Sequence, residues 1–319
     1  MGIGSLRLSS RVVVLLALFI AVGMPGHSES GSAAEVDERV GLVRDIYPGW
    51  SPDGRHITFH STRMGPVAQI FRMELATGEV TQLTSGPGEK RVARWSPDGR
   101  RIAFHREEDE TLPGDLFVMN ADGSGLENLT RDAAGYWHPS WVSNDQILFD
   151  SDRDDSGEAE VGNKELYILS LSSGSVERLT HFDDWDTYGS VSPDGTRITW
   201  RRVIRNEDGT RNAEVFVMDR DGSNKVNLSR HAAFDSYPTW SPNGKRILFA
   251  SNRDEENYED FNLYLIDPDG TSLVKITETI AHVEQIRPMF SPDGESIIYN
   301  RQDLEGRIEI YRLAVERNP

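Results

Sequence analysis

The stretch Trp50-Ser51-Pro52-Asp53-Gly54 decides the fold, because the chain repeats it along its whole length. The further copies are Trp95-Ser96-Pro97-Asp98-Gly99, the shortened Trp141-Val142-Ser143-Asn144-Asp145, Val191-Ser192-Pro193-Asp194-Gly195, Trp240-Ser241-Pro242-Asn243-Gly244 and Phe290-Ser291-Pro292-Asp293-Gly294. The leading residues of these six stretches stand 45 to 50 positions apart. A period of this size is typical of propeller blades. The repeat therefore predicts six blades.

The Ser-Pro-Asp-Gly core of the repeat has the composition of a tight hairpin turn. Proline presets φ at the second position, aspartate accepts local hydrogen bonds, and glycine adopts a positive φ at the fourth position. The third copy is one residue shorter, and its Asn144-Asp145 predicts a two-residue turn in place of the usual one. Each copy therefore predicts the hairpin between the first and second strands of a blade.

Apolar β-type segments follow each turn at regular positions. Those that follow the turn directly are Ile57-Thr58-Phe59, Ile102-Ala103-Phe104, Ile147-Leu148-Phe149, Ile198-Thr199-Trp200, Ile247-Leu248-Phe249 and Ile297-Ile298-Tyr299. A third segment such as Asp115–Met119 and a fourth ending near Leu129 complete the unit. The pattern predicts an all-β fold, a six-bladed β-propeller of four-stranded antiparallel blades.

The last repeat is one strand short. In the other five repeats a leucine or isoleucine follows the third-strand aromatic residue by twelve positions, but the chain ends at Pro319, before the partner of Tyr311 is reached. The segment Val40–Asp45 resembles a fourth strand such as Asn128–Asp132. We therefore predict that residues 38–44 complete the sixth blade and close the ring, which removes an exposed sheet edge.

The first 34 residues have the pattern of a secretory signal peptide. Arg7 and Arg11 precede an apolar run over residues 12–24, and small residues end the segment at Ala33 and Ala34. The run is shorter than the about 20 residues that a membrane-spanning helix needs. We predict a signal peptide over 1–34, a propeller over 35–319, and a periplasmic or secreted protein without membrane insertion after cleavage. An uncleaved N-terminal anchor is the alternative.

Composition narrows the function classes. The chain carries 34 basic and 52 acidic residues, a formal net charge of −18, so nucleic acids and anionic lipid surfaces are disfavoured partners. It has no cysteine, which excludes disulfides, thiolate nucleophiles, cysteine-ligated zinc and lipidation at a lipobox. No Gly-x-Ser-x-Gly elbow, P-loop or dinucleotide fingerprint occurs. We therefore expect a protein that is not an enzyme.

The repeat resembles that of the TolB-type propellers, also called PD40 or WD40-like repeats. The resemblance rests on the Ser-Pro-Asp-Gly turn, on Ser61-Thr62-Arg63 with its counterparts Ser151-Asp152-Arg153 and Ser251-Asn252-Arg253, and on the Asn120-Ala121-Asp122-Gly123 hairpin. It extends over residues 38–319. TolB proper carries an α/β domain ahead of the propeller, and prolyl oligopeptidases add a hydrolase domain; we expect neither in this chain. The resemblance implies capture of an extended peptide segment at the funnel.

Two sets of equivalent positions surround the mouth of the predicted channel, on the face that carries the loops between blades. We call it the loop face, and the opposite one the turn face. The residues just after the second strands are His60, His105, Asp150, Arg201, Ala250 and Asn300, and those just before the first strands are Tyr47, Val92, His138, Tyr188, Tyr237 and Arg287. Trp185 lies in a neighbouring loop. All but Ala250 and Val92 are predicted ligand contacts, suited to a protein segment or a carbohydrate. Packing between blades, or simple exposure to solvent, is the alternative role.

Metal binding is the second interpretation of the same positions. His60, His105 and His138 with Asp150 offer ligands for a transition metal, as some pectin-fragment lyases with this fold hold a cation with several histidines. The segment Asp150–Glu158 resembles a calcium loop, although it lacks glycine at the sixth position. We predict no cofactor and an exported binding module. A metal-assisted polysaccharide lyase or hydrolase and a purely structural envelope module are the alternatives.

Overall fold

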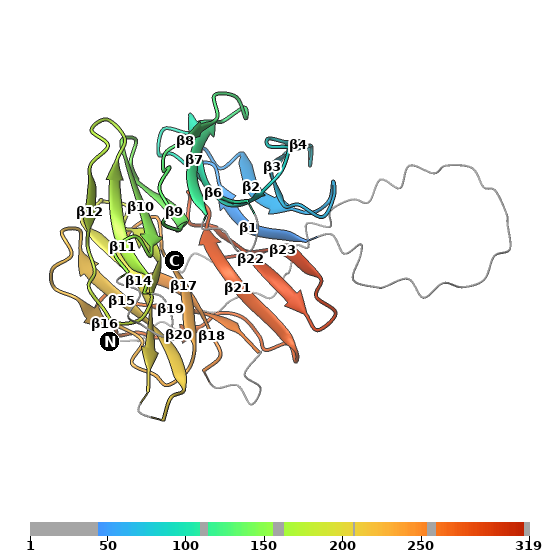
Figure 1. Cartoon of the computed structure of the whole chain (residues 1–319). Coiled ribbons are helices and arrows are strands. Elements are labelled where there is room, and N and C mark those ends of the chain that lie inside the picture. Colours follow the sequence, from blue (N-terminus) through green and yellow to red (C-terminus); the bar gives the residue numbers. More distant parts are fainter. Residues whose placement is uncertain (1–43, 109–113, 156–162, 207, 254–259, 316–319) are drawn as a thin grey trace, which may run out of the picture.

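The protein is a ring of six antiparallel blades, as the sequence predicted. The computed structural model describes residues 44–108, 114–155, 163–206, 208–253 and 260–315. Within them, five sheets have four strands and the last has three, each in the order of the sequence. The blades follow one another around the ring, so that the first and last lie next to each other (Figure 1).

The strands of each blade run outward from the axis in chain order. In the first three blades they are β1 Asp45–Trp50, β2 His56–Ser61, β3 Gln69–Glu74, β4 Val80–Gln82; β5 Glu89–Trp95, β6 Arg101–Glu107, β7 Asp115–Asn120, β8 Glu127–Asn128; β9 Tyr136–Ser143, β10 Gln146–Ser151, β11 Glu165–Ser170, β12 Val176–Arg178. In the last three they are β13 Asp186–Val191, β14 Arg197–Arg205, β15 Arg211–Asp219, β16 Val226–Asn227; β17 Asp235–Trp240, β18 Ile247–Ser251, β19 Asn262–Ile266, β20 Val274–Lys275; β21 Val283–Phe290, β22 Ser296–Asp303, β23 Ile308–Ala314.

The Ser-Pro-Asp-Gly turns have the predicted geometry. In the first copy the Ser51 hydroxyl donates to the Asp53 carboxylate over 2.6 Å, and the Gly54 amide donates to the Ser51 carbonyl over 3.0 Å. Gly54 has φ +69°, which favours glycine at this position. The shortened third copy also makes its predicted two-residue turn, because Ser143 pairs directly with Gln146.

Paired aromatic side chains, most of them buried, join the second and third strands within each blade. A ring from the second strand packs against a ring from the third strand in every blade: Phe59–Phe71, Phe104–Phe117, Phe149–Tyr167, Trp200–Phe216, Phe249–Tyr264 and Tyr299–Tyr311. An arginine guanidinium covers each pair at 4.2 to 5.7 Å from a ring centre: Arg63, Arg106, Arg153, Arg202, Arg253 and Arg301. The Ser-x-Arg motif therefore supplies structural cation–π contacts in three blades, through Arg63, Arg153 and Arg253, and an arginine outside this motif supplies them in the other three.

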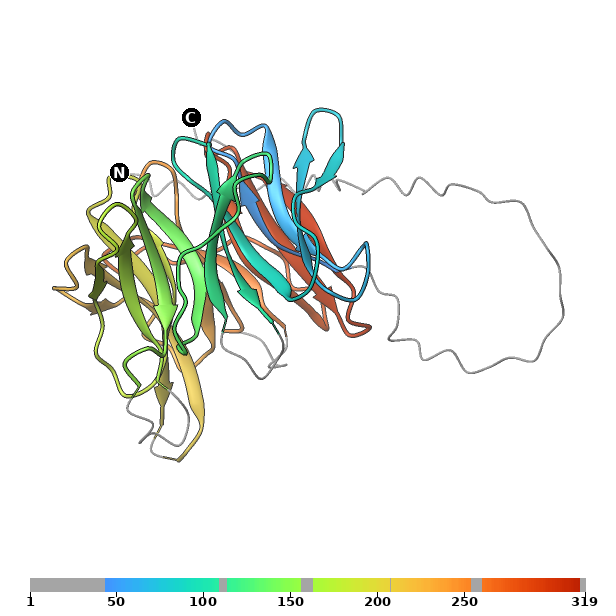
Figure 2. The same ribbon diagram turned by 45° about the horizontal axis from the view of Figure 1, so that its top comes forward.

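The first and last blades lie side by side (Figure 2). They share one core, which joins the two ends of the ring. Ile298 of β22 belongs to the same buried cluster as Trp50, Ile57 and Phe59. Arg44 forms a bridge with Ile308, as Trp185 does with Lys164 and Phe234 with Ala213 at the corresponding points of other blades. Residues 38–43 of the predicted closing strand lie outside the described residues, so closure by that strand stays a prediction.

The structure tests neither the signal peptide nor the location of the protein, because residues 1–34 also lie outside the described residues. In the part of the chain that is described, no helix is long and apolar enough to cross a membrane.

Candidate ligand-binding site on the propeller axis

Each blade bends its first strand at one bulged residue near the channel. The six residues are Tyr47, Val92, His138, Tyr188, Tyr237 and Arg287, and all have positive φ values between 47° and 57°. The strand register shifts next to each of them. Four are followed by proline, which a sheet tolerates at a bulge because no ladder donor is needed there. A bulge re-aims its side chain, here toward the axis.

Five of these six side chains meet on the axis, and we call Tyr47, His138, Tyr188, Tyr237 and Arg287 the axial cluster. The Tyr188 ring lies with its centre 4.8 Å from that of Tyr237 and 3.9 Å from that of His138. The guanidinium of Arg287 lies 4.7 Å from the Tyr47 ring centre and 5.3 Å from that of Tyr237. The sequence-predicted residues of the first strands therefore come from five blades to one place.

The predicted residues of the second strands lie behind this cluster and support it. Asn300 and Asp150 are fully buried, and they accept hydrogen bonds from the backbone amides of Tyr47 (3.0 Å) and Tyr188 (3.3 Å) in the next blade. The Val92 amide donates to His60 in the same way over 3.4 Å. His60, Asp150 and Asn300 thus hold the bulges of neighbouring blades in place.

Arg201 occupies the corresponding position in the fourth blade and is half-buried. Its guanidinium lies 4.5 Å from the Tyr188 ring centre, and its Nε donates to the Thr187 hydroxyl over 3.0 Å. Unlike its counterparts it brings a positive charge against the axial cluster.

Three of the four predicted metal ligands lie together. His138 Nδ1 is 2.9 Å from an Asp150 oxygen, and the His105 ring centre is 5.7 Å from that of His138, whereas His60 stacks on Tyr47. Burial lowers the pKa of His60 and His105 well below the usual value, so both are neutral. Among the described residues no group of three or more histidines, aspartates or glutamates could hold a metal ion. Part of the predicted calcium loop, residues 156–158, lies outside those residues.

Trp185 lies apart from the axial cluster, in the connection between the third and fourth blades. Lys164 is sandwiched between indole rings, with its Nζ 3.5 Å from the Trp137 ring centre and 5.7 Å from that of Trp185. Arg211 covers the same Trp185 ring at 5.3 Å. Trp137 and Lys164 were not predicted from the sequence, because their contact joins the first strand of the third blade to the residue just before its third strand, which lie far apart along the chain.

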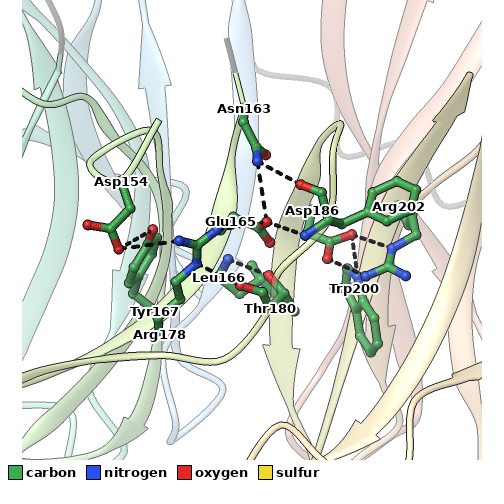
Figure 3. A network of polar contacts seen from close by, with 11 residues as sticks. Asp154, Asn163, Glu165, Leu166, Tyr167, Arg178, Thr180, Asp186, Trp200 and Arg202 are labelled. Atoms are coloured by element: carbon green, nitrogen blue, oxygen red, sulfur yellow. Dashed lines mark hydrogen bonds and ion pairs between the residues drawn. The ribbon is translucent and has the colours of Figure 1, made fainter. Parts of the chain in front are cut away.

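A buried polar network fixes the connection that leads into Tyr188 (Figure 3). Glu165 accepts hydrogen bonds from Arg178 over 3.1 Å and from the Phe182 amide, and burial raises its pKa. Asp186, fully buried, accepts from the Trp200 indole over 2.8 Å and pairs with Arg202 over 2.6 Å. These bonds hold the backbone at Phe182 and at Asp186, just before the Tyr188 bulge.

A cavity of about 100 Å³ lies along the axis, bounded by the bulges and by the residues that follow them toward the turn face. Arg94, which the sequence analysis missed, projects into it two positions after the Val92 bulge. The strand pattern could have predicted this position, because Arg94 and Val92 are alternate residues of β5 and alternate residues of a strand share a face. Burial raises the pKa of the Tyr47 phenol to about 12, so that side chain remains a neutral donor.

Several relatives match parts of the chain. The uncharacterized protein Atu1656 of Agrobacterium fabrum is 33% identical over 164 residues, which cover 49% of this chain and 54% of the relative. The Tol-Pal system protein TolB of Francisella tularensis is 26% identical over 184 residues, which cover 56% of this chain and 40% of that protein. The chain thus spans about half the length of the relatives it matches.

Solved structures confirm the fold. A putative TolB from Agrobacterium tumefaciens superposes with a TM-score of 0.63 at 20% identity, covering 86% of this chain and 91% of that one. An oligogalacturonate lyase in complex with manganese gives 0.58 at 14% identity, covering 88% and 92%. At such identities the likeness shows the fold alone. The family description "TolB beta propeller domain" matches residues 45–258, about two thirds of the sequence, and the chain therefore belongs to the PD40 family of TolB β-propeller domains.

Proposed function

We propose that this chain is an exported, non-catalytic propeller that binds an extended protein segment against the axial cluster, with a glycan as the alternative ligand. The observation that supports the proposal is the convergence of three tyrosines and one arginine from four different blades on one axis. Tyrosine and arginine are enriched at the energetic centres of protein interfaces. Rigid strands hold these side chains, which lowers the entropy cost of binding.

The loop face is the better side for recognition. The turn-face polar groups are already used, since the serine of each full turn copy donates to the side chain two residues on. Ser96 bonds Asp98 in this way over 2.7 Å, and Ser241 bonds Asn243 over 2.8 Å. The bulged residue is instead the third residue of the first strand in four blades, close to where the loops between blades enter. Tyr188, Tyr237 and Arg287 are only half-buried there. Their exposed parts are free for a ligand.

A protein partner is the first ligand class to test. One relative is a Tol-Pal system protein, a name that places it in a system of several proteins. A displayed library of extended peptides and a glycan array, both probed with the mature protein, would supply a binder of either class. The affinity of the best binder is then measured by titration calorimetry.

Tyr188→Ala and Tyr237→Ala provide the decisive variants. Each should weaken the binder by about 1–2 kcal/mol, or roughly five- to thirtyfold, without loss of the folded state. Tyr311→Ala is the matched control, because Tyr311 is also half-buried but lies on the third strand of the last blade. A binder that ignores both axial variants and is weakened by Asp98→Asn or Asp293→Asn would place the site on the turn face and refute the proposal.

A metal-assisted lyase or hydrolase is the rival function to test, although His105, His138 and Asp150 do not form a group that could hold a metal ion among the described residues. The same purified protein distinguishes the two. A stoichiometric transition metal that survives dialysis and is lost in His105→Ala and His138→Ala would favour the enzyme.

A further inference from the structure

The axial cavity has a charge opposite to that of the whole chain. Two arginines, Arg94 of the second blade and Arg287 of the sixth, are among the residues that line it, and none of the described lining residues is acidic. The chain as a whole has 52 acidic and 34 basic residues. A cationic cavity in such a composition points to an anionic ligand.

Arg287 lacks the partners that a buried guanidinium normally has. The Nε and Nη1 atoms of Arg287 are buried without a hydrogen-bond acceptor among the described residues. No carboxylate of the described residues forms an ion pair with this guanidinium. The ring faces of Tyr47 and Tyr237 stabilise the charge by cation–π contact but leave the Nε and Nη1 groups without an acceptor among the described residues. Burying a cation without an acceptor is costly. An anion in the cavity would satisfy it.

Arg94 adds a second positive charge next to Tyr47, with its guanidinium 5.9 Å from the centre of that ring. Its Nη1 donates only to backbone carbonyls, those of Ala93 at 3.1 Å and Pro48 at 3.5 Å. Burial lowers its pKa to about 10, so the side chain is still charged at neutral pH. The hydroxyls of Ser140, Ser190 and Thr239 add neutral donors to the lining.

We infer that the axial cavity binds a carboxylate of the protein segment captured by the axial cluster, with Arg287 as the main contact and Arg94 as the second. This inference rests on the proposed function. The planar guanidinium matches a carboxylate in charge and in geometry. Sites for a whole drug-sized ligand occupy about 300–1,000 Å³, so a cavity of about 100 Å³ suits one charged group rather than a sugar ring.

Small probes test the inference without knowledge of the natural partner. N-acetylglycine carries a peptide-like carboxylate, N-acetylglycinamide is its neutral analogue, and inorganic phosphate and glucuronate represent the competing anions. Binding of each to the mature protein is measured by ligand-observed NMR titration at constant ionic strength. We expect N-acetylglycine to bind more tightly than the other three.

Arg287→Gln should weaken N-acetylglycine about 10- to 100-fold, since a hydrogen bond between charged groups is lost. Arg94→Gln should weaken it less, and serves as the test if Arg287→Gln does not fold. Arg55→Gln is the control, because this arginine lies on a turn with 79% of its side chain exposed and should bind the probe like the wild type.

Four results would each overturn the inference. They are equal binding of the amide, tighter binding of phosphate or glucuronate, no binding of N-acetylglycine, and unchanged binding by folded Arg287→Gln. A selected peptide that depends on Tyr188 and Tyr237 but not on Arg287 would remove this inference and leave the proposed function standing. If instead a carboxylate-dependent peptide ignored both tyrosines, the proposed function would fail by itself.

Discussion

Asn300 is the side chain whose loss should open the ring between its last and first blades. It is fully buried in β22, and its Oδ1 accepts from the Tyr47 amide over 3.0 Å. Its Nδ2 donates to the carbonyls of Asp45 over 2.8 Å and Glu309 over 3.2 Å. One amide thus joins the sixth blade to the first across about 250 residues of sequence.

Asn300→Ala removes all three bonds at once. A hydrogen bond contributes about 0.5–1.5 kcal/mol net, so the free energy of unfolding should fall by about 3 kcal/mol. For a chain of this size that corresponds to a melting temperature lower by about 5–10 °C. Urea unfolding followed by Trp fluorescence and calorimetry measures both quantities.

Asn144→Ala is the matched control for this prediction. Its side chain also links two blades, accepting from the Asp98 amide over 3.1 Å, but the bond is exposed. Surface substitutions of this kind usually change stability by less than about 0.5 kcal/mol. If Asn300→Ala were no more destabilised than Asn144→Ala, the link between the blades would not depend on this amide.

Three further predictions concern the ends and the turns of the chain. Deleting residues 35–45, so that the mature chain starts at Ile46, should cause aggregation or a large loss of stability; a soluble truncation with an unchanged melting temperature would rule out ring closure by residues 38–44. Intact-mass analysis of exported protein should find a mature N-terminus between residues 31 and 35, most simply at Glu35, and retention of Met1 in membrane-bound protein would contradict the signal peptide. Hydrogen bonds from serine hydroxyls and backbone amides lower the pKa of the turn aspartates, that of Asp194 to about 2. The contribution of these carboxylates to stability is therefore complete above about pH 4, and it is lost as the pH falls through their pKa values in the folded protein. Thermal scans from pH 5 to pH 2 should show this loss of stability. Asp98→Asn should reduce the loss without breaking the turn, because Asn243 makes the same bonds in the fifth copy. An unchanged pH profile in this variant would contradict the stabilising role of the turn carboxylates.

The positions of the predicted site residues could be read from the sequence, but their individual roles could not. The equivalent positions around the channel were found by counting from the repeated turn, and the structure places them around the axis. Counting did not reveal that these residues have two different roles. Asp150 and Asn300 bond the backbone of the next blade, whereas Tyr188 and Arg287 face the channel.

The sequence by itself determined the blade, because its decisive features are local. A proline, an aspartate and a glycine at fixed offsets specify the turn through φ angles and hydrogen bonds that span five residues or fewer. The spacing of the copies then determined the number of blades. Six blades of this length predicted an all-β ring before any contact between them was known.

Only the tertiary structure decided what happens on the axis. No glycine marks the six bulges, so nothing in the sequence indicated that Val92 or Tyr188 adopts a positive φ. The meeting of Arg94 with Arg287 depends on strands nearly 200 residues apart and on the radius of the closed ring. Residue spacing fixes where a side chain stands on its own blade, but the closure of all six blades decides which side chains share a cavity and which charges remain there without a partner.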